Sequence, residues 1–557
     1  MSDDDDEAGR SGQVRARIEL MVQDPEMARE RHAAPITEPQ ILSDEFFLDG
    51  PVSRRVAIVD FDPDDGHVLS GARWVAPRAG TRTGTYEVGD PDSESFRQVN
   101  VFGTVHKTLA MFERPGVLGR KITWGFGSPQ LLVVPRAGVD SNAYYERESR
   151  SLQFFHFPDT SGATIYTAMS RDVVAHETGH AILDGIAPSL YDCLSPQAIA
   201  LHETIADMTA LVMAVESRKL RTWLLKQTKN RIDTPNALAQ IAEQFGRALD
   251  SRTTSLRNML TERTLDDVIS NEPHELSEIL SASIYRVFIK MFEDAKQPGL
   301  RAGAAKRSPE QALGLAVERL KRIFFRALDF MPPGEIGFVD YARAVVAADA
   351  AAYPREGTDR AAFVHELVKR KIATARQLAI PRRPKFPGID VAALLHSDLA
   401  AYRFADRHRS ELSIPDDADF EVVKRLATDH DRFNDDGSKE QMHEMMFKVQ
   451  WLVDEAGGVS IDGETDRAIM RGTTIVFDAG SGAVRSCLTN AVHPAAHEAV
   501  ARADRDSMLR RLLDEGLRLS DVGDSAGVPG PRAHRGRHGS VRVLGAASAL
   551  HLASWGR

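Results

Sequence analysis

The sequence contains little that would place the protein outside the cell or in a membrane. Its 557 residues include two cysteines, Cys193 and Cys487, too few for a disulfide framework or a zinc knuckle. The acidic N-terminus lacks the apolar segment of a signal peptide. No apolar run reaches about 18 residues, so we expect no transmembrane helix. These absences predict a cytoplasmic protein, with export by a leaderless route as the alternative.

An excess of positive charge is also lacking. The 70 lysines and arginines are outnumbered by 80 aspartates and glutamates, which gives a formal net charge of −10. Because nucleic-acid-binding proteins usually carry a basic surface, we expect no nucleic-acid partner. With 42% hydrophobic and 27% charged residues, the composition is that of a globular protein, and the length permits several domains.

Changes in hydrophobic pattern and turn-forming residues divide the chain into consecutive parts, one boundary being the proline-rich segment 381–388. The predicted parts are a flexible acidic and charged leader (1–50), a strand-rich lobe (51–165), a helical lobe (166–380), an additional mixed α/β region (381–521) and a disordered tail (522–557). We expect a short helix within 14–31 of the leader.

Within these parts the pattern predicts individual elements. Strands are expected at 56–61, 130–135, 141–145, 151–157, 473–477 and 483–488. Helices are expected at 101–112, 172–183, 236–249, 313–330, 338–352, 420–426 and 439–453, with two more beginning at Pro196 and Pro273.

The chemistry centres on residues 172–183, which contain the pattern His176-Glu177-x-x-His180. Residues four apart lie on one face of a helix, so the two imidazoles can bind one metal ion while Glu177 acts as a general base. The alternative is a pair of solvated histidines on an ordinary helix. The apolar residues that surround the pattern favour a buried helix instead.

A second helix begins at Ser195-Pro196, a good start signal, and carries Glu203 and Asp207 on one face. Carboxylates among apolar residues need partners. Glu203 is a candidate third metal ligand, and Asp207 is a candidate to hold a metal-binding histidine. The alternative is an exposed acidic edge.

The region 142–285 resembles the thermolysin-like zinc peptidases of the gluzincin group. Besides the two histidines and the acidic pair, it matches that family at Asp172-Val-Val, at Asn142-Ala143, at Tyr191 and at His274. The resemblance implies an α+β fold with a thermolysin-like two-lobe catalytic unit over about residues 55–350. The zinc helix would lie between the lobes.

The resemblance also implies a function, a zinc-dependent endopeptidase that hydrolyses peptide bonds with a zinc-activated water. One zinc ion would be held by His176, His180 and Glu203, with Glu177 as the base. Tyr191 and His274 would stabilise the oxyanion, and Asp207 would orient His176. Asn142 and Ala143 would hold an extended peptide or protein substrate. Without the resemblance, the simpler interpretation is that Tyr191 is part of a turn and that His274 lies at the start of a helix, each with a structural role only.

Several family features lack a clear counterpart here. Ala214 stands where the family has an acidic calcium ligand, so we do not predict a double calcium site, although Asp172 is retained. The carboxylate that pairs with the catalytic histidine is assigned to Glu272, Asp266 or Asp267. The arginine that contacts substrate is assigned to Arg247, Arg252 or Arg257.

Two other functions compete with the peptidase. The first is a zinc-retaining module that binds a peptide or protein without turnover, which the intact Glu177 disfavours. The second is a metal hydrolase acting on another substrate, which Asn142-Ala143 disfavours because this pair suits an extended backbone.

Overall fold

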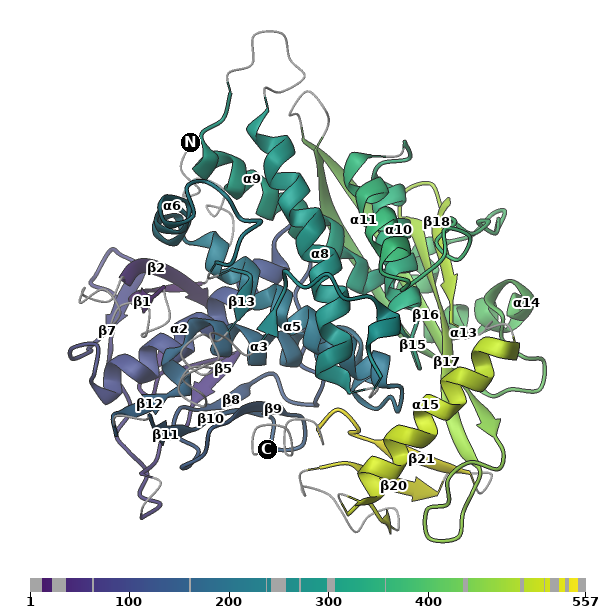
Figure 1. Cartoon of the computed structure of the whole chain (residues 1–557), viewed down its shortest axis with the longest axis horizontal. Coiled ribbons are helices and arrows are strands. Elements are labelled where there is room, and N and C mark those ends of the chain that lie inside the picture. The colour runs from purple at the N-terminus through teal and green to yellow at the C-terminus, as the bar shows by residue number, and fades with distance from the viewer. Residues whose placement is uncertain are drawn as a thin grey trace.

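The structure is a computed structural model that describes residues 13–22, 37–62, 65–159, 162–236, 238–241, 257–269, 272–297, 306–355, 357–433, 439–490, 495–514, 516–520, 530–535 and 540–548. The expected α+β fold is confirmed, since helices and several separate sheets occur together. Figure 1 shows the N-terminal sheets on one side, the C-terminal sheet on the other, and helices between them. The two-lobe arrangement stays a prediction.

Two sheets form the N-terminal part. The first has the order β2-β1-β7-β6, and the second the order β3-β4-β5-β8-β10-β9. In the second sheet β5, β8 and β10 run parallel, while β9 is antiparallel to β10 and forms an edge. The bounds are β1 Val14–Met21, β2 Thr37–Asp44, β3 Phe47–Leu48, β4 Val52–Ser53, β5 Val56–Ile58, β6 Trp74–Val75, β7 Thr83–Tyr86, β8 Leu131–Val134, β9 Ala143–Glu146 and β10 Ser151–Phe154.

Part of the predicted leader is wrong. Instead of a short helix, residues 14–21 form β1, which pairs with β2 along its whole length. Alternate residues of β1, Ala16, Ile18 and Leu20, are buried in the core, and this period of two is that of a strand. Residues 37–50 of the predicted leader contain β2 and β3, whereas residues 1–12 and 23–36 lie outside the described residues.

The helical part follows a short hairpin and a 3₁₀ turn. Helix α3, which carries the two candidate metal histidines, packs against α5, and α5 packs against α8. The bounds are α2 Glu94–Glu113, β11 His156–Pro158, β12 Thr164–Tyr166, η1 Thr167–Met169, α3 Arg171–Ile186, α4 Pro188–Tyr191, α5 Pro196–Glu216, α6 Arg218–Gln227, β13 Gln240–Ile241, β14 Arg257–Asn258, η2 Leu265–Asp267, α8 Pro273–Lys296, α9 Pro309–Leu320, η3 Lys321–Phe325, η4 Arg326–Phe330, α10 Phe338–Ala352 and α11 Thr358–Lys369.

Most helix predictions in this part are confirmed, including the start of α5 at Pro196 and the bounds of α10. The helix expected at 236–249 is wrong where it can be judged, because residues 240–241 form strand β13. Residues 242–249 lie outside the described residues. Ser195 precedes α5, but its side chain makes no capping hydrogen bond. The carboxylate of Glu335 instead accepts from the N–H groups of Leu194 and Ser195, at 2.9 and 3.2 Å.

Helix α5 is apolar and long enough to cross a membrane, with a mean hydropathy of 1.5 over its best window. Every residue of that window is buried inside the structure. The helix therefore forms part of the core, between α3 and α8.

The C-terminal region is a seven-stranded sheet with the order β15-β16-β17-β21-β20-β19, in which β18 also pairs with β17. The helices expected at 420–426 and 439–453 are wrong, because both segments are strands, β15 and β16. The expected strands at 473–477 and 483–488 are confirmed. The bounds are α12 Val391–His396, α13 Asp398–Arg407, α14 Arg409–Leu412, β15 Phe420–Phe433, β16 Lys439–Glu455, β17 Arg467–Asp478, β18 Val484–Thr489, α15 Ala495–Asp514, β19 Leu519–Ser520, β20 Arg532–Arg535 and β21 Val541–Leu544.

The predicted disordered tail is also partly wrong. Strands β20 and β21 pair with each other, and Ala533, Val541 and Val543 pack in a core with Leu194 and Ile199 at the start of α5. Residues 522–529, 536–539 and 549–557 lie outside the described residues.

The C-terminal sheet is joined to the helical part through the end of α3. Nζ of Lys424, on β15, donates to the carbonyl oxygens of Gly185 and Ile186, both at 3.1 Å. These carbonyls lie in the last turn of α3, where a cation is favourable. Burial lowers the pKa of Lys424 to about 8. The region after residue 380 is thus in direct contact with the helix that carries His176 and His180.

Candidate metal centre

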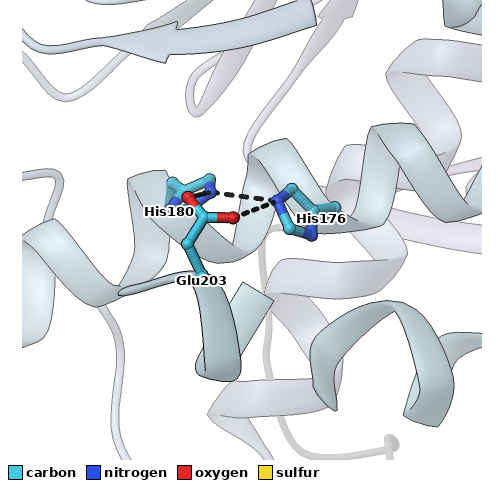
Figure 2. A group of neighbouring side chains, drawn as sticks. All are labelled: His176, His180 and Glu203. Atoms are coloured by element: carbon cyan, nitrogen blue, oxygen red, sulfur yellow. Dashed lines mark hydrogen bonds and ion pairs between the residues drawn. The ribbon is translucent and has the colours of Figure 1, made fainter. Parts of the chain in front are cut away.

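The structure brings His176, His180 and Glu203 together, all within 4.8 Å of one another when measured between potential ligand atoms. Nε2 of His176 lies 3.1 Å from Nε2 of His180. The Glu203 carboxylate lies 3.5 Å from His176 and 3.6 Å from His180. Figure 2 shows the two imidazoles on neighbouring turns of α3, with Glu203 reaching them from α5. These three residues could hold a metal ion.

The donor set fits a metal such as zinc. Ligands about 2.1 Å from a tetrahedral ion lie roughly 3.4 Å apart, close to the three separations observed. The Glu203 side chain is 1% exposed and has histidine side chains around it. A buried carboxylate is costly unless a cation compensates its charge, so the burial of Glu203 itself favours an ion at this place.

Gly179, between the two histidines, allows α3 and α5 to approach closely. A Cβ atom at this position would lie 3.0 Å from Cα of Ala206 and 3.1 Å from Oγ1 of Thr209, both on α5. Such contacts are too tight for an ordinary side chain without displacement of α5. The glycine therefore helps to place Glu203 within reach of the histidines.

Each of the two candidate ligand histidines also contacts a polar residue of α5 other than Glu203. Nδ1 of His176 lies 3.1 Å from Oδ1 of Asp207, which is one turn past Glu203 on α5. The ring of His202 stacks on the ring of His180, with the two Nδ1 atoms 3.5 Å apart. Groups of this kind fix the orientation of metal-binding imidazoles. Asp207 is close to the histidine that it was predicted to orient, and that role stays a prediction; His202 was not predicted.

Glu177 faces the edge strand β9. Its Oε2 accepts a hydrogen bond of 3.1 Å from the backbone N–H of Tyr145. Tyr145 lies opposite Leu152 in the register with β10, but its N–H points to Glu177 and not to that strand. Only 1% of Glu177 is exposed. The candidate base thus contacts the outer edge of a sheet from the helix that carries the two histidines.

Asn142 and Ala143 lie at the start of this edge strand. The carbonyl oxygen of Asn142 accepts from the N–H of Phe155 at 3.2 Å, so Asn142 is hydrogen-bonded to the next strand. Because this bonding alternates along an antiparallel pair, the backbone groups of Ala143 and Tyr145 face the opposite, outer edge. An extended peptide could pair there, although no contact tests this role.

His274, at the start of α8, also reaches the metal group. Its Nε2 lies 3.6 Å from Oε2 of Glu203, and its Nδ1 lies 2.8 Å from Oε1 of Glu272. Burial raises the pKa of Glu272, but the hydrogen bond and charge of His274 lower it overall. Among the predicted partners of His274, Glu272 is the one in contact. Asp266 instead pairs with Lys371, and Asp267 bonds to Thr264.

Tyr191 lies beside the group but in a different environment. Its ring packs edge-on against His202 and Tyr145, and Cζ of Arg147 lies 4.2 Å from its centroid. Burial, and then the charge of Glu146, raise the pKa of Tyr191. In the described part of the chain, no hydrogen bond or ion pair joins Tyr191 to the metal group. Its predicted role as an oxyanion donor stays a prediction.

A buried ionic cluster supports this corner of the site. Asp184, one turn past His180, accepts from the hydroxyl of Tyr145 at 2.6 Å and from Nε of Arg147 at 3.0 Å. Arg147 also donates to Asp192 at 3.0 Å, next to Tyr191. Burial raises the pKa of Asp184, and Arg147 opposes this effect. The spacing of Asp184 from His180 was the one sequence signal that could have identified this cluster.

The last described segment covers the same corner. The N–H of Ala547 donates to the carbonyl of Tyr191 at 3.1 Å, and the N–H of Gly545 donates to Asp192 at 2.8 Å. Of the candidate substrate arginines, Arg257 lies in β14, while Arg247 and Arg252 lie outside the described residues.

In comparisons with known proteins, no protein-family model and no curated protein matches this chain. A function can therefore be inferred only from the sequence pattern and from the geometry of the site.

Proposed function

We propose that this protein is a zinc-dependent endopeptidase whose zinc ion is held by His176, His180 and Glu203. The observation that carries the proposal is the position of Glu177. Glu177 directly follows the candidate ligand His176 on α3, and its carboxylate contacts the outer edge of β9 through the N–H of Tyr145. A base placed between a metal group and a strand edge suits the hydrolysis of an extended backbone.

The proposed roles follow from these positions. A bound zinc ion supplies Lewis acidity, which polarises a peptide carbonyl and makes a water molecule more acidic. Glu177 takes the proton of the attacking water and passes it to the leaving amine. The hydrogen bond from Tyr145 fixes the carboxylate in the required orientation. The outer edge of β9 holds the substrate as an added strand.

His274 has a separate role, to stabilise negative charge that develops on the carbonyl oxygen. In its imidazolium form both ring nitrogens donate, Nδ1 to Glu272 and Nε2 toward the metal group. Asp207 keeps the ring of His176 in place by accepting at its other nitrogen. Tyr191 is retained as a second oxyanion donor on the resemblance to thermolysin-like peptidases alone.

The test is cleavage of a quenched, internally labelled peptide library by the purified protein, with and without a chelator. We expect cuts inside peptides that stop with the chelator and return when zinc is added. Glu177→Ala should retain one zinc ion and lose at least about 10²-fold in turnover. The exposed Glu411→Ala is the matched control. Cleavage by Glu177→Ala at the wild-type rate would refute the mechanism.

The same assay separates the alternative, a zinc-retaining binding module. Wild-type protein that holds one zinc ion and binds library peptides without cutting them would favour that module. In that case Glu177→Ala would bind the same peptides with unchanged affinity, because no turnover would depend on the base.

A further inference from the structure

Arg97, the fourth residue of α2, combines several unfavourable features. Only 5% of the residue is exposed. Cζ of Arg97 lies 3.7 Å from the centroid of the Tyr166 ring, so one face of the guanidinium is covered. Among the described residues, none accepts a hydrogen bond from its buried Nε or Nη1. A buried cation without a hydrogen-bonded partner is costly in a folded protein.

Two further effects add to this cost. A positive charge near the N-terminus of a helix opposes the helix dipole. Burial and, to a lesser degree, the like charge of Arg136 lower the pKa of Arg97, whereas Tyr166, Asp60 and Glu94 act in the opposite direction. A negatively charged ligand at this place would offset each of these effects at once.

Two charged residues whose charges act on Arg97 follow the carboxyl ends of two parallel strands. Asp60 follows β5 and Arg136 follows β8, and the two are joined by a contact of 3.3 Å. Gln98, the neighbour of Arg97 on α2, donates to Asp60 at 2.9 Å. Ligands commonly bind at the carboxyl ends of parallel strands, beside the start of a helix.

Arg136 provides further donors. Its Nε faces Asp60 and its Nη1 lies 3.3 Å from the half-exposed Glu94, but its buried Nη2 has no acceptor among the described residues. Asp60 and Glu94 thus balance the charge of Arg136. Among the described residues Arg97 forms no such ion pair, so a ligand could balance its charge.

We propose that Arg97 and Arg136 form a binding site for a phosphate-type oxyanion, either inorganic phosphate or the phosphate group of a small molecule. Guanidinium groups bind phosphate oxygens through paired N–H donors, and the Tyr166 ring holds the plane of Arg97 in a fixed orientation. The site does not depend on the proposed peptidase activity, because it shares no residue with the metal group.

The first test measures the melting temperature of the full-length protein in sodium phosphate and in sodium chloride at matched ionic strength. We expect phosphate to raise the melting temperature of the wild type saturably, by about 2 °C, because a ligand that binds only the folded state stabilises it. Glycerol 3-phosphate, compared with inorganic phosphate, distinguishes a phosphomonoester from the free ion. Stabilisation by acetate equal to that by phosphate would overturn the assignment to phosphate.

The matched variants are Arg97→Met and, as a control, Arg78→Met at an exposed position. Arg97→Met should lose the phosphate effect and melt no lower than wild type in chloride, whereas Arg78→Met should retain the effect. An equal phosphate effect in Arg97→Met would overturn the proposal. Calorimetric titration of the wild type with phosphate is the check that needs no variant: one site per chain supports the proposal, and no binding overturns it.

Discussion

The backbone N–H of Tyr145 donates to Oε2 of Glu177 over 3.1 Å, which joins the outer edge of a sheet to the helix that carries His176 and His180. The contact holds the carboxylate of Glu177 at the outer edge of β9. Both residues are almost fully buried, so their relative position is fixed by packing. The proposed hydrolysis depends on this arrangement as much as on the three candidate ligands.

Removal of the metal should destabilise the protein, because Glu203 would remain buried among histidines without a compensating cation. At free zinc about 1,000 times its Kd, bound zinc stabilises the folded state by about 4 kcal/mol. Calorimetry with a chelator should show a lower melting temperature that zinc restores and magnesium does not. An unchanged melting temperature after verified metal removal would contradict a structural contribution of the ion.

Replacing Gly179 by valine should both destabilise the protein and weaken zinc binding. The new side chain would press on Ala206 and Thr209 and displace α5. We expect a loss of about 1–3 kcal/mol in the free energy of unfolding, measured with urea. The control is Gly314→Ala in α9, where a Cβ makes only ordinary contacts, the nearest at 3.6 Å. Equal stability of Gly179→Val and wild type would show that α5 need not approach so closely.

Asp207→Asn should reduce zinc affinity by about 10–100-fold while leaving the ligands in place. The carboxylate of Asp207 lies 3.1 Å from Nδ1 of His176 and favours the tautomer that presents Nε2 to the metal. Competition with a chromophoric chelator measures the affinity. Asp406→Asn, at a half-exposed position paired with Arg409, provides the comparison and should bind zinc as wild type does.

His274→Gln should lower kcat by about 10²–10³-fold and leave zinc content unchanged, because its proposed interaction is made only with developing charge. Steady-state kinetics on a peptide identified from the library, with metal analysis, measures both quantities. His396→Gln, at an exposed position of α12, should behave as wild type. If kcat is retained in His274→Gln, the histidine serves only to begin α8.

Glu216 at the end of α5 should make stability depend on pH in the acid range. Burial raises its pKa, but Lys321 and Arg114 lower it more, from 4.5 to about 2. A lowered pKa stabilises the folded state above pH about 4.5, and this contribution of about 3 kcal/mol is lost as the pH falls toward 2. The free energy of unfolding, measured with urea from pH 5 to 2, should therefore change less with pH for Glu216→Gln than for the wild type. The exposed Glu440→Gln should behave as the wild type does.

The sequence predicted best those elements whose pattern is local. The bounds of α10 and the start of α5 followed from apolar spacing and from a proline at the first helical position. The long strand β16 was mistaken for a helix because it is buried on both faces. Phe447 and Val449 pack in one core, while Met446 packs in another, so no alternation is visible.

In the candidate site, too, the features with a local sequence pattern were predicted and those set by the packing of distant segments were not. The spacing of His176, His180 and Glu203 along two helices was sufficient to predict that they converge. The contacts of Glu177 with Tyr145 and of His180 with His202 depend on how β9 and α5 pack against α3. Lone tyrosines and histidines carry no sequence signal for such contacts, because the partners come from distant segments.

The contact of Lys424 with the last turn of α3 also bears on how the protein is synthesised. The donor lies 239 residues after Gly185, so a ribosome must add those residues before this contact with the end of α3 can form. The N-terminal 380 residues emerge first, with the carbonyls of Gly185 and Ile186 not yet bound to this lysine. Formation of this contact between β15 and the end of α3 is in this way tied to synthesis of the chain as far as β15.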